Sequence, residues 1–283
     1  MKNQNSHHVE RLIYEMQLRN YSSKTVNSYS SLLSKVESFY HLPFDQISTQ
    51  QFKDYLLQRI TVEAISTSMI NQYISAFKIM QIDVLKRDWE QIRIKRPRRV
   101  KRLPVVLSTD EIEKLIAVTK NLKHKAILML AYSSGLRRQE IQMLKPAAID
   151  SARMQVHVVQ GKGKKDRYTI LSPKALETLR LYYKYERPSC YLFEAQGKKG
   201  KQLADATLNC IVKKLATKAG IKKQVSFHTL RHCFATHLLE KGVNLKLIQQ
   251  LMGHVSIKTT SGYLHLVNVN LSSVVSPLDS MKV

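Results

Sequence analysis

Apolar positions in the first ninety residues follow a helical pattern. They recur three or four places apart over residues 26–40, again over residues 52–59 after the capping candidate Ser48, and again over residues 70–82. No stretch here alternates between apolar and polar positions as a half-buried strand would. We therefore predict an all-α unit of four short helices that occupies residues 1–92.

A basic, proline-containing segment follows this unit. Residues 93–104 hold seven basic residues and two prolines. Proline disfavours a helix, and like charges in one segment repel each other. We interpret the segment as an extended interdomain linker, which divides the chain into residues 1–92, the linker and residues 105–283, with a C-terminal tail from about residue 264.

Beyond the linker the pattern mixes helices with one short pair of strands. A capping box at Ser108–Glu111 opens a helix, and two alternating segments enclose a glycine- and lysine-rich turn. Helices are predicted from the capping box and at 126–132, 137–144, 173–186, 205–219, 227–241 and 244–252, and strands at 155–160 and 167–171. The fold class predicted for the whole chain is mainly α, with a small antiparallel β-sheet in a mixed α/β C-terminal domain.

The charge of the chain points to a polyanionic partner. Forty-six lysines and arginines stand against 21 acidic residues, which gives a formal net charge of +25. Such an excess neutralises phosphates and releases their counterions. No apolar run is long enough for a membrane span, the N-terminus lacks the apolar stretch of a signal peptide, and three cysteines suggest no disulfide framework. We expect a cytoplasmic protein with no membrane partner.

Five residues form the candidate chemistry of the last two thirds: Arg137, His228, Arg231, His254 and Tyr263. Guanidinium groups match phosphate oxygens, imidazoles exchange protons near neutral pH, and a tyrosine can act as a covalent nucleophile. A metal-dependent nuclease would instead require clustered carboxylates. The set therefore suits metal-independent chemistry on a phosphodiester, and we expect no cofactor and no metal.

The order of these motifs resembles the tyrosine recombinases, the family of Xer, lambda integrase and Cre. The matching series is Gly-Leu-Arg with Arg137, a lysine in a predicted hairpin, His-x-x-Arg with His228 and Arg231, Gly-His with His254, and Tyr263 nine residues later. The resemblance implies a helical, SAM-like core-binding domain followed by a catalytic domain. The Gly-Lys-Gly setting implies Lys162 as the hairpin lysine.

The resemblance also implies a role for each residue. Arg137 and Arg231 would clamp the scissile phosphate, and Tyr263 would attack it to give a 3′-phosphotyrosyl link without ATP. His228 and His254 would donate hydrogen bonds or move protons. Lys162 would protonate the departing 5′ oxygen, with Lys164 and Lys165 as competitors for that role and His228 as the next candidate.

Three neighbouring residues receive structural interpretations. Glu140 lies three residues after Arg137, where it can brace that guanidinium. His232 and His237 share a predicted helix with His228 and Arg231, and we expect both to lie off the active face.

Several alternatives remain open at this stage. A type IB topoisomerase uses the same chemistry on a single duplex, and a non-catalytic DNA-binding protein would need only the basic surface. Among recombinases, integration or excision of a mobile element and Xer-type resolution are not separated. The family resemblance implies double-stranded DNA with inverted-repeat core sites as the partner, a nucleoid-associated location, and self-association to dimers and tetramers on DNA, for which the apolar C-terminal tail is a candidate contact.

Overall fold

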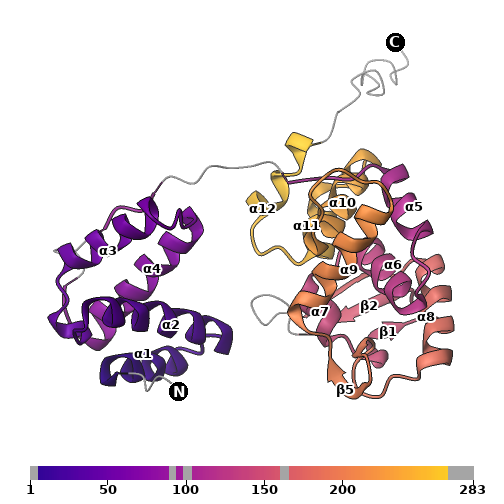
Figure 1. The fold of residues 1–283 in the computed structure, drawn as a ribbon. Helices are drawn as coiled ribbons and strands as arrows, with labels where there is room; N and C mark the ends of the chain where they lie inside the picture. The colour runs from indigo at the N-terminus through magenta and orange to yellow at the C-terminus, as the bar shows by residue number, and fades with distance from the viewer. Residues whose placement is uncertain (1–5, 89–93, 98–103, 160–165, 267–283) are drawn as a thin grey trace, which may run out of the picture. The chain divides into compact units, whose positions relative to one another are not determined.

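The computed structural model describes residues 6–88, 94–97, 104–159 and 166–266. The chain divides into two compact units, Met1–Lys101 and Arg102–Val283 (Figure 1). Within the described residues, no helix is both long enough and apolar enough to cross a membrane.

The N-terminal unit is helical throughout its described residues. Its elements are α1 (His7–Leu18), α2 (Ser23–Tyr40), a 3-10 turn η1 (Phe44–Gln46), α3 (Thr49–Thr61), α4 (Thr67–Ile79) and a π-helical turn η2 (Met80–Val84). Serine side chains cap the starts of all four α-helices, and Ser48 and Gln51 form a full capping box on α3. The all-α prediction for this unit is confirmed.

The core of this unit comes from the apolar stripe of each helix. Phe52 of α3 stacks on Phe77 of α4 with ring centroids 3.9 Å apart, and Phe44 lies against the same ring at 5.8 Å. All three rings are fully buried. Aromatic pairs of this kind add about 1 kcal/mol beyond the burial of their area.

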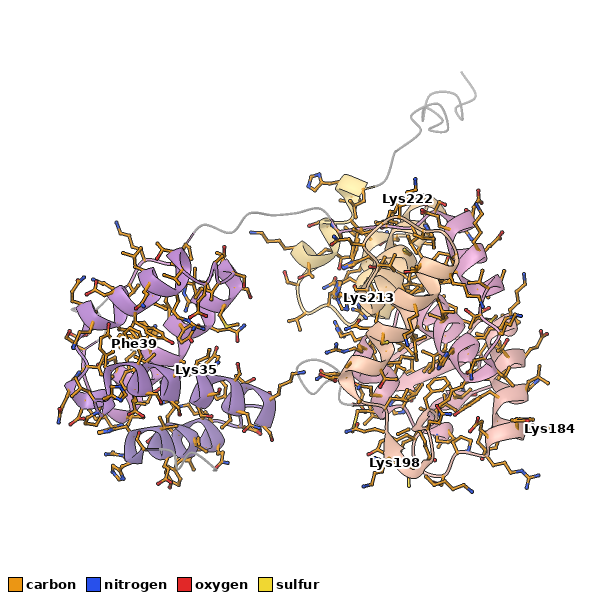
Figure 2. All side chains as sticks on the ribbon, viewed as in Figure 1. Lys35, Phe39, Lys184, Lys198, Lys213 and Lys222 are labelled. Carbon is orange, nitrogen blue, oxygen red and sulfur yellow. The ribbon has the colours of Figure 1, made fainter. Side chains whose placement is uncertain are left out.

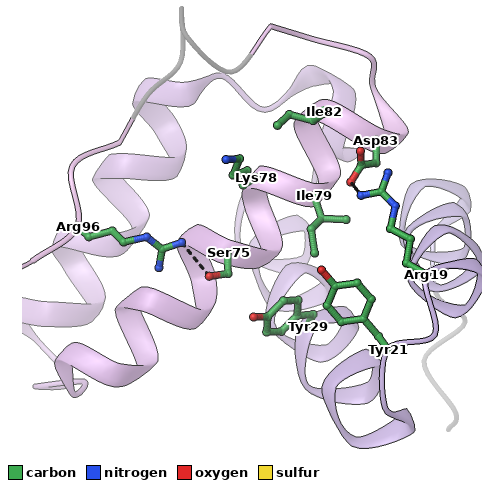
Figure 3. A pocket seen from close by; sticks show the side chains of 9 residues that line it. All are labelled: Arg19, Tyr21, Tyr29, Ser75, Lys78, Ile79, Ile82, Asp83 and Arg96. Carbon is green, nitrogen blue, oxygen red and sulfur yellow. Dashed lines mark hydrogen bonds and ion pairs between the residues drawn. The ribbon is translucent and has the colours of Figure 1, made fainter. Parts of the chain in front are cut away.

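Arg96, which lies in the described part of the predicted linker, folds back onto α4. Its guanidinium donates to the backbone and side-chain oxygens of Asn71 at 3.1 Å and to Ser75 Oγ at 3.0 Å. Together with Arg19, which pairs with Asp83, it lines a pocket of about 360 Å³ beside α4 (Figure 3). Residues 94–97 have no regular secondary structure, and Arg96 fastens them to the helical unit.

The C-terminal unit surrounds a small sheet with helices. Its helices are α5 (Thr109–Ala117), α6 (Leu122–Ser134), α7 (Arg138–Met143), α8 (Pro173–Glu186), α9 (Asp205–Lys218), α10 (Phe227–Glu240), α11 (Leu245–Met252) and α12 (Ile257–Ser261), with 3-10 turns η3 (Pro146–Ala148) and η4 (Leu264–Leu266). The strands β1 (Ile149–Asp150), β2 (Gln155–Val158) and β3 (Arg167–Ile170) form one antiparallel sheet. A second antiparallel pair joins β4 (Glu194–Ala195) and β5 (Lys198–Gln202). The predicted fold class is confirmed, whereas β1 and the β4–β5 pair were not predicted.

Helix α10 is the element on which the candidate site depends. It packs against α6 and α11 (Figure 1). Helix α11 also lies against β3. Phe227, Leu230 and Cys233 of α10 join the main core, while Phe234 and Ala235 join a smaller cluster with Ile248, Met252 and Tyr263. The helix is therefore fixed on both sides, which holds its polar residues at defined positions.

Candidate active site

Three arginines converge on one buried carboxylate. Arg167 donates two hydrogen bonds of 2.7 Å to the two oxygens of Glu140, and Arg137 donates one of 2.8 Å. The backbone N–H of Arg137 adds a fourth bond at 2.7 Å, and Arg231 Nη1 lies 4.0 Å from Glu140. Three positive groups against one negative group leave two net positive charges at this point, which favours an anionic ligand.

The same arginines bond to the carbonyl groups at helix ends. Arg167 Nε donates to Leu251 O at 2.8 Å, Arg231 Nη2 to Met252 O at 2.5 Å and Arg137 Nη2 to Gly253 O at 3.0 Å, all at the C-terminus of α11. The last carbonyls of a helix lack partners within the helix and carry partial negative charge. These contacts therefore hold the cations in place through three successive carbonyls.

Arg231 is the most buried member of the site. It is 1% exposed and donates a second bond to Gly135 O, at the C-terminal end of α6, at 2.6 Å. Burial, followed by the charge of Arg137, lowers the pKa of Arg231 to about 9. The group remains a cation at neutral pH, and its planar fork is fixed between α6 and α11.

Glycines at the two helix ends allow this close approach. Gly135 and Gly253 both adopt left-handed backbone conformations, with φ of 60° and 61°. A Cβ at Gly135 would lie 2.3 Å from the ring of Phe234, and one at Gly253 would lie 2.7 Å from the Arg167 side chain. Glycine is therefore required at both positions by conformation and by space.

Tyr263 is buried at the edge of this cationic group. It is 6% exposed and packs with Phe234, Ile248 and Met252. Burial raises the pKa of its phenol, while Arg231 and Arg137 act in the opposite direction. The resting phenol is therefore protonated at neutral pH.

His232 makes the direct contact with this phenol. Its Nδ1 lies 2.9 Å from the Tyr263 hydroxyl, and the ring centroids are 5.6 Å apart. The prediction that His232 lies off the active face is wrong, because residues four apart on a helix share a face. His228 and His232 have this spacing, and their rings meet edge to face at 5.1 Å. Burial, then His228 and Arg231, lower the pKa of His232 to about 4.

His254 and His228 complete the polar surroundings of Tyr263. The His254 ring lies parallel to the Tyr263 ring at 6.4 Å, and its Nδ1 is 2.9 Å from Thr260 Oγ1. Burial, then Arg231 and Arg137, lower the pKa of His254 to about 3. His228 is exposed, and desolvation followed by the same two arginines lowers its pKa as well. Both imidazoles are neutral at pH 7.

His237 has a structural role, as predicted. Its Nδ1 lies 2.9 Å from the Tyr132 hydroxyl and its Nε2 lies 2.9 Å from Leu107 O. These contacts tie α10 to α6 and to the segment that precedes α5. Lys162, Lys164 and Lys165 lie outside the described residues, so the predicted hairpin lysine is not placed.

Sequence reasoning missed Arg167 as well as His232. Arg167 is the first residue of β3, two places before Thr169, which is buried. Side chains two apart on a strand point to the same face. The apolar residues of β3, Tyr168 and Ile170, are nonetheless the exposed ones. The alternation of the strand therefore gave no signal in the sequence that Arg167 faces inward.

Both units carry exposed lysines. Lys35, Lys184, Lys198, Lys213 and Lys222 are all exposed (Figure 2). Among the described residues, no three histidine, cysteine, aspartate or glutamate side chains gather as a metal site. The arrangement that the structure contains is a buried phenol beside fixed cations and neutral imidazoles.

Comparison with known proteins places the two units in one family. The phage integrase family matches residues 105–268, and the phage integrase N-terminal SAM-like domain matches residues 9–91. A Sinorhizobium fredii protein that carries the name integrase/recombinase y4qK is 35% identical over 271 residues, which cover 95% of this chain and 88% of that protein. Tyrosine recombinase XerA of Pyrococcus horikoshii is 32% identical over 274 residues, which cover 96% and 93%.

A solved structure has the same fold. The XerH site-specific recombinase bound to a palindromic difH substrate, in a post-cleavage complex, aligns with a TM-score of 0.70 at 22% identity over 96% of this chain and 84% of that one. The family match extends over more than half of the chain and includes every described residue of the candidate site. The chain belongs to the phage integrase family, the tyrosine recombinases.

Proposed function

We propose that this protein is a site-specific recombinase that cleaves and rejoins double-stranded DNA through a 3′-phosphotyrosyl intermediate. The observation that carries the proposal is that Tyr263 lies beside the imidazoles of His232 and His254 and within the electrostatic influence of Arg231 and Arg137. Phosphoryl transfer builds negative charge on the equatorial oxygens of the phosphate, and fixed cations stabilise that charge. A protein that only bound DNA would have no use for a nucleophile buried next to such a site.

Each side chain has a role in the proposed reaction. Arg137 and Arg231 donate some of their guanidinium N–H groups to protein oxygens. Their remaining N–H groups donate to the nonbridging oxygens of the scissile phosphate. His254, whose Nδ1 is engaged by Thr260, offers Nε2 to the phosphate, and His228 donates from the exposed side. Tyr263 attacks phosphorus, and Lys162 protonates the 5′ oxygen as it leaves.

Contacts within the protein itself hold the positive arginine cluster in place. Glu140 and the carbonyls at the ends of α6 and α11 fix the guanidinium groups. Preorganised charges of this kind cost no reorganisation during the reaction. This supports catalysis over simple phosphate binding, for which flexible surface lysines would suffice.

The wider assembly follows from the same proposal. The N-terminal helical unit and the catalytic unit, joined by a basic linker at residues 93–104, would both bind a core site with inverted repeats. Strand exchange requires two duplexes, so we propose a dimer on each site and a tetramer in the synapse, with the tail after about residue 264 as the subunit contact. The relatives carry both Xer and integrase names, so both chromosome resolution and mobile-element transfer fit the site.

Covalent capture tests the proposal directly. Sheared genomic DNA of the source organism is incubated with the protein in EDTA, and SDS-resistant adducts are recovered and sequenced. We expect one recurring sequence with an imperfect inverted repeat, linked through its 3′ phosphate. Tyr263→Phe is the matched control and should bind the recovered sequence without forming the adduct. An adduct in Tyr263→Phe, or none in the wild type, would overturn the proposal.

A further inference from the structure

The proposed cleavage step leaves one proton without an assigned acceptor. Tyr263 is a neutral phenol at rest, because burial raises its pKa. Its proton must leave as the bond from oxygen to phosphorus forms. Arginine does not accept a proton, and the Glu140 carboxylate, with a pKa of about 2, already accepts four hydrogen bonds. The acceptor must therefore come from another group that touches the phenol.

We propose that His232 accepts the Tyr263 proton during DNA cleavage and returns it during rejoining. Its Nδ1 lies 2.9 Å from the phenolic oxygen, within the range that direct proton transfer requires. The inference rests on the proposed recombinase function and names the base for that reaction. The Nδ1 of His254, by contrast, is directed to Thr260 Oγ1.

The contact joins two fixed groups. His232 is half-buried in the middle of α10, and that helix is packed on two sides. Tyr263 is held by Phe234, Ile248 and Met252. Neither ring must move for the hydrogen bond to form, so the acceptor is in position before the substrate arrives.

Burial, followed by His228 and Arg231, lowers the pKa of His232 and keeps the ring neutral, so it is able to accept a proton. The groups that face it are His228 on the same helix face, the adjacent Arg231, and Tyr263 across the hydrogen bond. A ring with a low pKa is a weak base toward a resting phenol. The phenol becomes far more acidic as its oxygen bonds to phosphorus, and the bound phosphate adds a negative charge that strengthens the imidazole as a base.

The step balances in atoms and charge. The Tyr263 O–H bond breaks and its proton moves to His232 Nδ1, while the Tyr263 oxygen bonds to phosphorus. The bond from phosphorus to the 5′ oxygen breaks, and that oxygen takes a proton from the general acid, for which Lys162 is proposed. On rejoining, the 5′ hydroxyl returns its proton to the group that served as general acid while its oxygen bonds to phosphorus. The bond from phosphorus to the Tyr263 oxygen breaks, and His232 returns its proton to Tyr263.

Two substitutions separate proton transfer from hydrogen bonding. In His232→Asn the side-chain amide reaches the position of Nδ1 and keeps the contact, but it does not take up a proton. In His232→Gln the amide reaches the position of Nε2 and loses the contact. Circular dichroism and binding to the recovered DNA sequence check that both variants fold.

The probe is a nicked duplex that carries the sequence recovered with the wild type, and the readout is the single-turnover rate of adduct formation from about pH 6 to 9. We expect a nearly flat wild-type profile. Both variants should be slower by about 100-fold at neutral pH. Their rates should rise by about tenfold per pH unit as hydroxide replaces the lost base.

The outcomes are distinguishable. If His232→Asn forms the adduct at the wild-type rate with a flat profile and only His232→Gln is slow, His232 positions the phenol and the inference is overturned while the proposed function stands. A slow variant with a flat profile also overturns it. If the wild type recovers no DNA at all, the proposed function fails and this inference fails with it.

Discussion

Replacement of Glu140 by glutamine should destabilise the catalytic unit. Burial raises the pKa of this carboxyl, but Arg167 and then Arg137 lower it to about 2 from a normal value of 4.5. The difference corresponds to about 3 kcal/mol in favour of the charged form. Removing one partner of a buried ion pair costs about 3–5 kcal/mol, since it leaves the other charge uncompensated. We therefore expect Glu140→Gln to lower the free energy of unfolding by about 3 kcal/mol at pH 7.

The pH dependence gives the sign of the effect. The folded-state pKa is lower than the unfolded-state value, so the contribution is complete above about pH 5 and is lost as the pH falls toward about 2. Hydrogen exchange of the catalytic-unit amides, measured against urea, reports the unfolding of this unit separately from the helical one. The gap between wild type and Glu140→Gln should close at low pH, whereas Glu113→Gln, at an exposed position on α5, should match the wild type throughout. The reasoning would be refuted if Glu140→Gln lowered the free energy of unfolding by less than about 1 kcal/mol at pH 7. It would also be refuted if the difference between wild type and variant persisted at low pH.

Three further predictions concern the clamp, the general acid and a glycine. Arg137→Ala should slow adduct formation by about 100-fold to 1,000-fold with little change in DNA affinity, which filter binding measures. A rate of adduct formation near that of the wild type would show that Arg137 does not bind the scissile phosphate. Lys162→Ala should be slow on normal DNA and rescued on DNA with a 5′-bridging sulfur, and failure of that rescue would place the acid elsewhere. Gly135→Ala should lower the free energy of unfolding by at least about 2 kcal/mol, because the new methyl group strains the backbone and clashes with Phe234. Gly220 also has a positive φ but has open space around it. Gly220→Ala should therefore lower the free energy of unfolding, measured in urea, by only about 1 kcal/mol.

Local signals in the sequence accounted for most of the fold. Capping boxes at Ser48 and Ser108 began α3 and α5 where predicted. The residues 173–186 form α8 at both predicted ends, and Gly135 ends α6. These features depend on neighbours within one or two turns, so they can be read without knowledge of the tertiary structure.

The elements that sequence reasoning missed depend on distant partners. β1 has only two residues, Ile149 and Asp150, and exists because it pairs with β2. The second strand pair includes Lys198–Gln202, a polar segment without apolar alternation. Neither segment shows a periodic pattern of apolar residues. Each is a strand because it pairs with a neighbouring strand, and not because it buries one apolar face.

The candidate site shows the same division. The spacing of His228 and Arg231 on α10 could be predicted, because both lie within one helical turn. The position of Arg167 could not be fixed in the same way, since its partners Glu140 and Leu251 lie 27 and 84 residues away. Its two bonds to Glu140 bring a third guanidinium to the carboxylate that Arg137 also contacts.

Three arginines in one site would repel each other, and the structure offsets this repulsion in two ways. Glu140 provides one full negative charge, and the ends of α6 and α11 provide partial charges through four carbonyls. A second carboxylate would reduce the net positive charge of the site by half and weaken its attraction for phosphate. Carbonyl dipoles instead fix the guanidinium groups while leaving most of their charge available to a ligand. The helix ends therefore explain how three guanidinium groups are held close together around a single carboxylate.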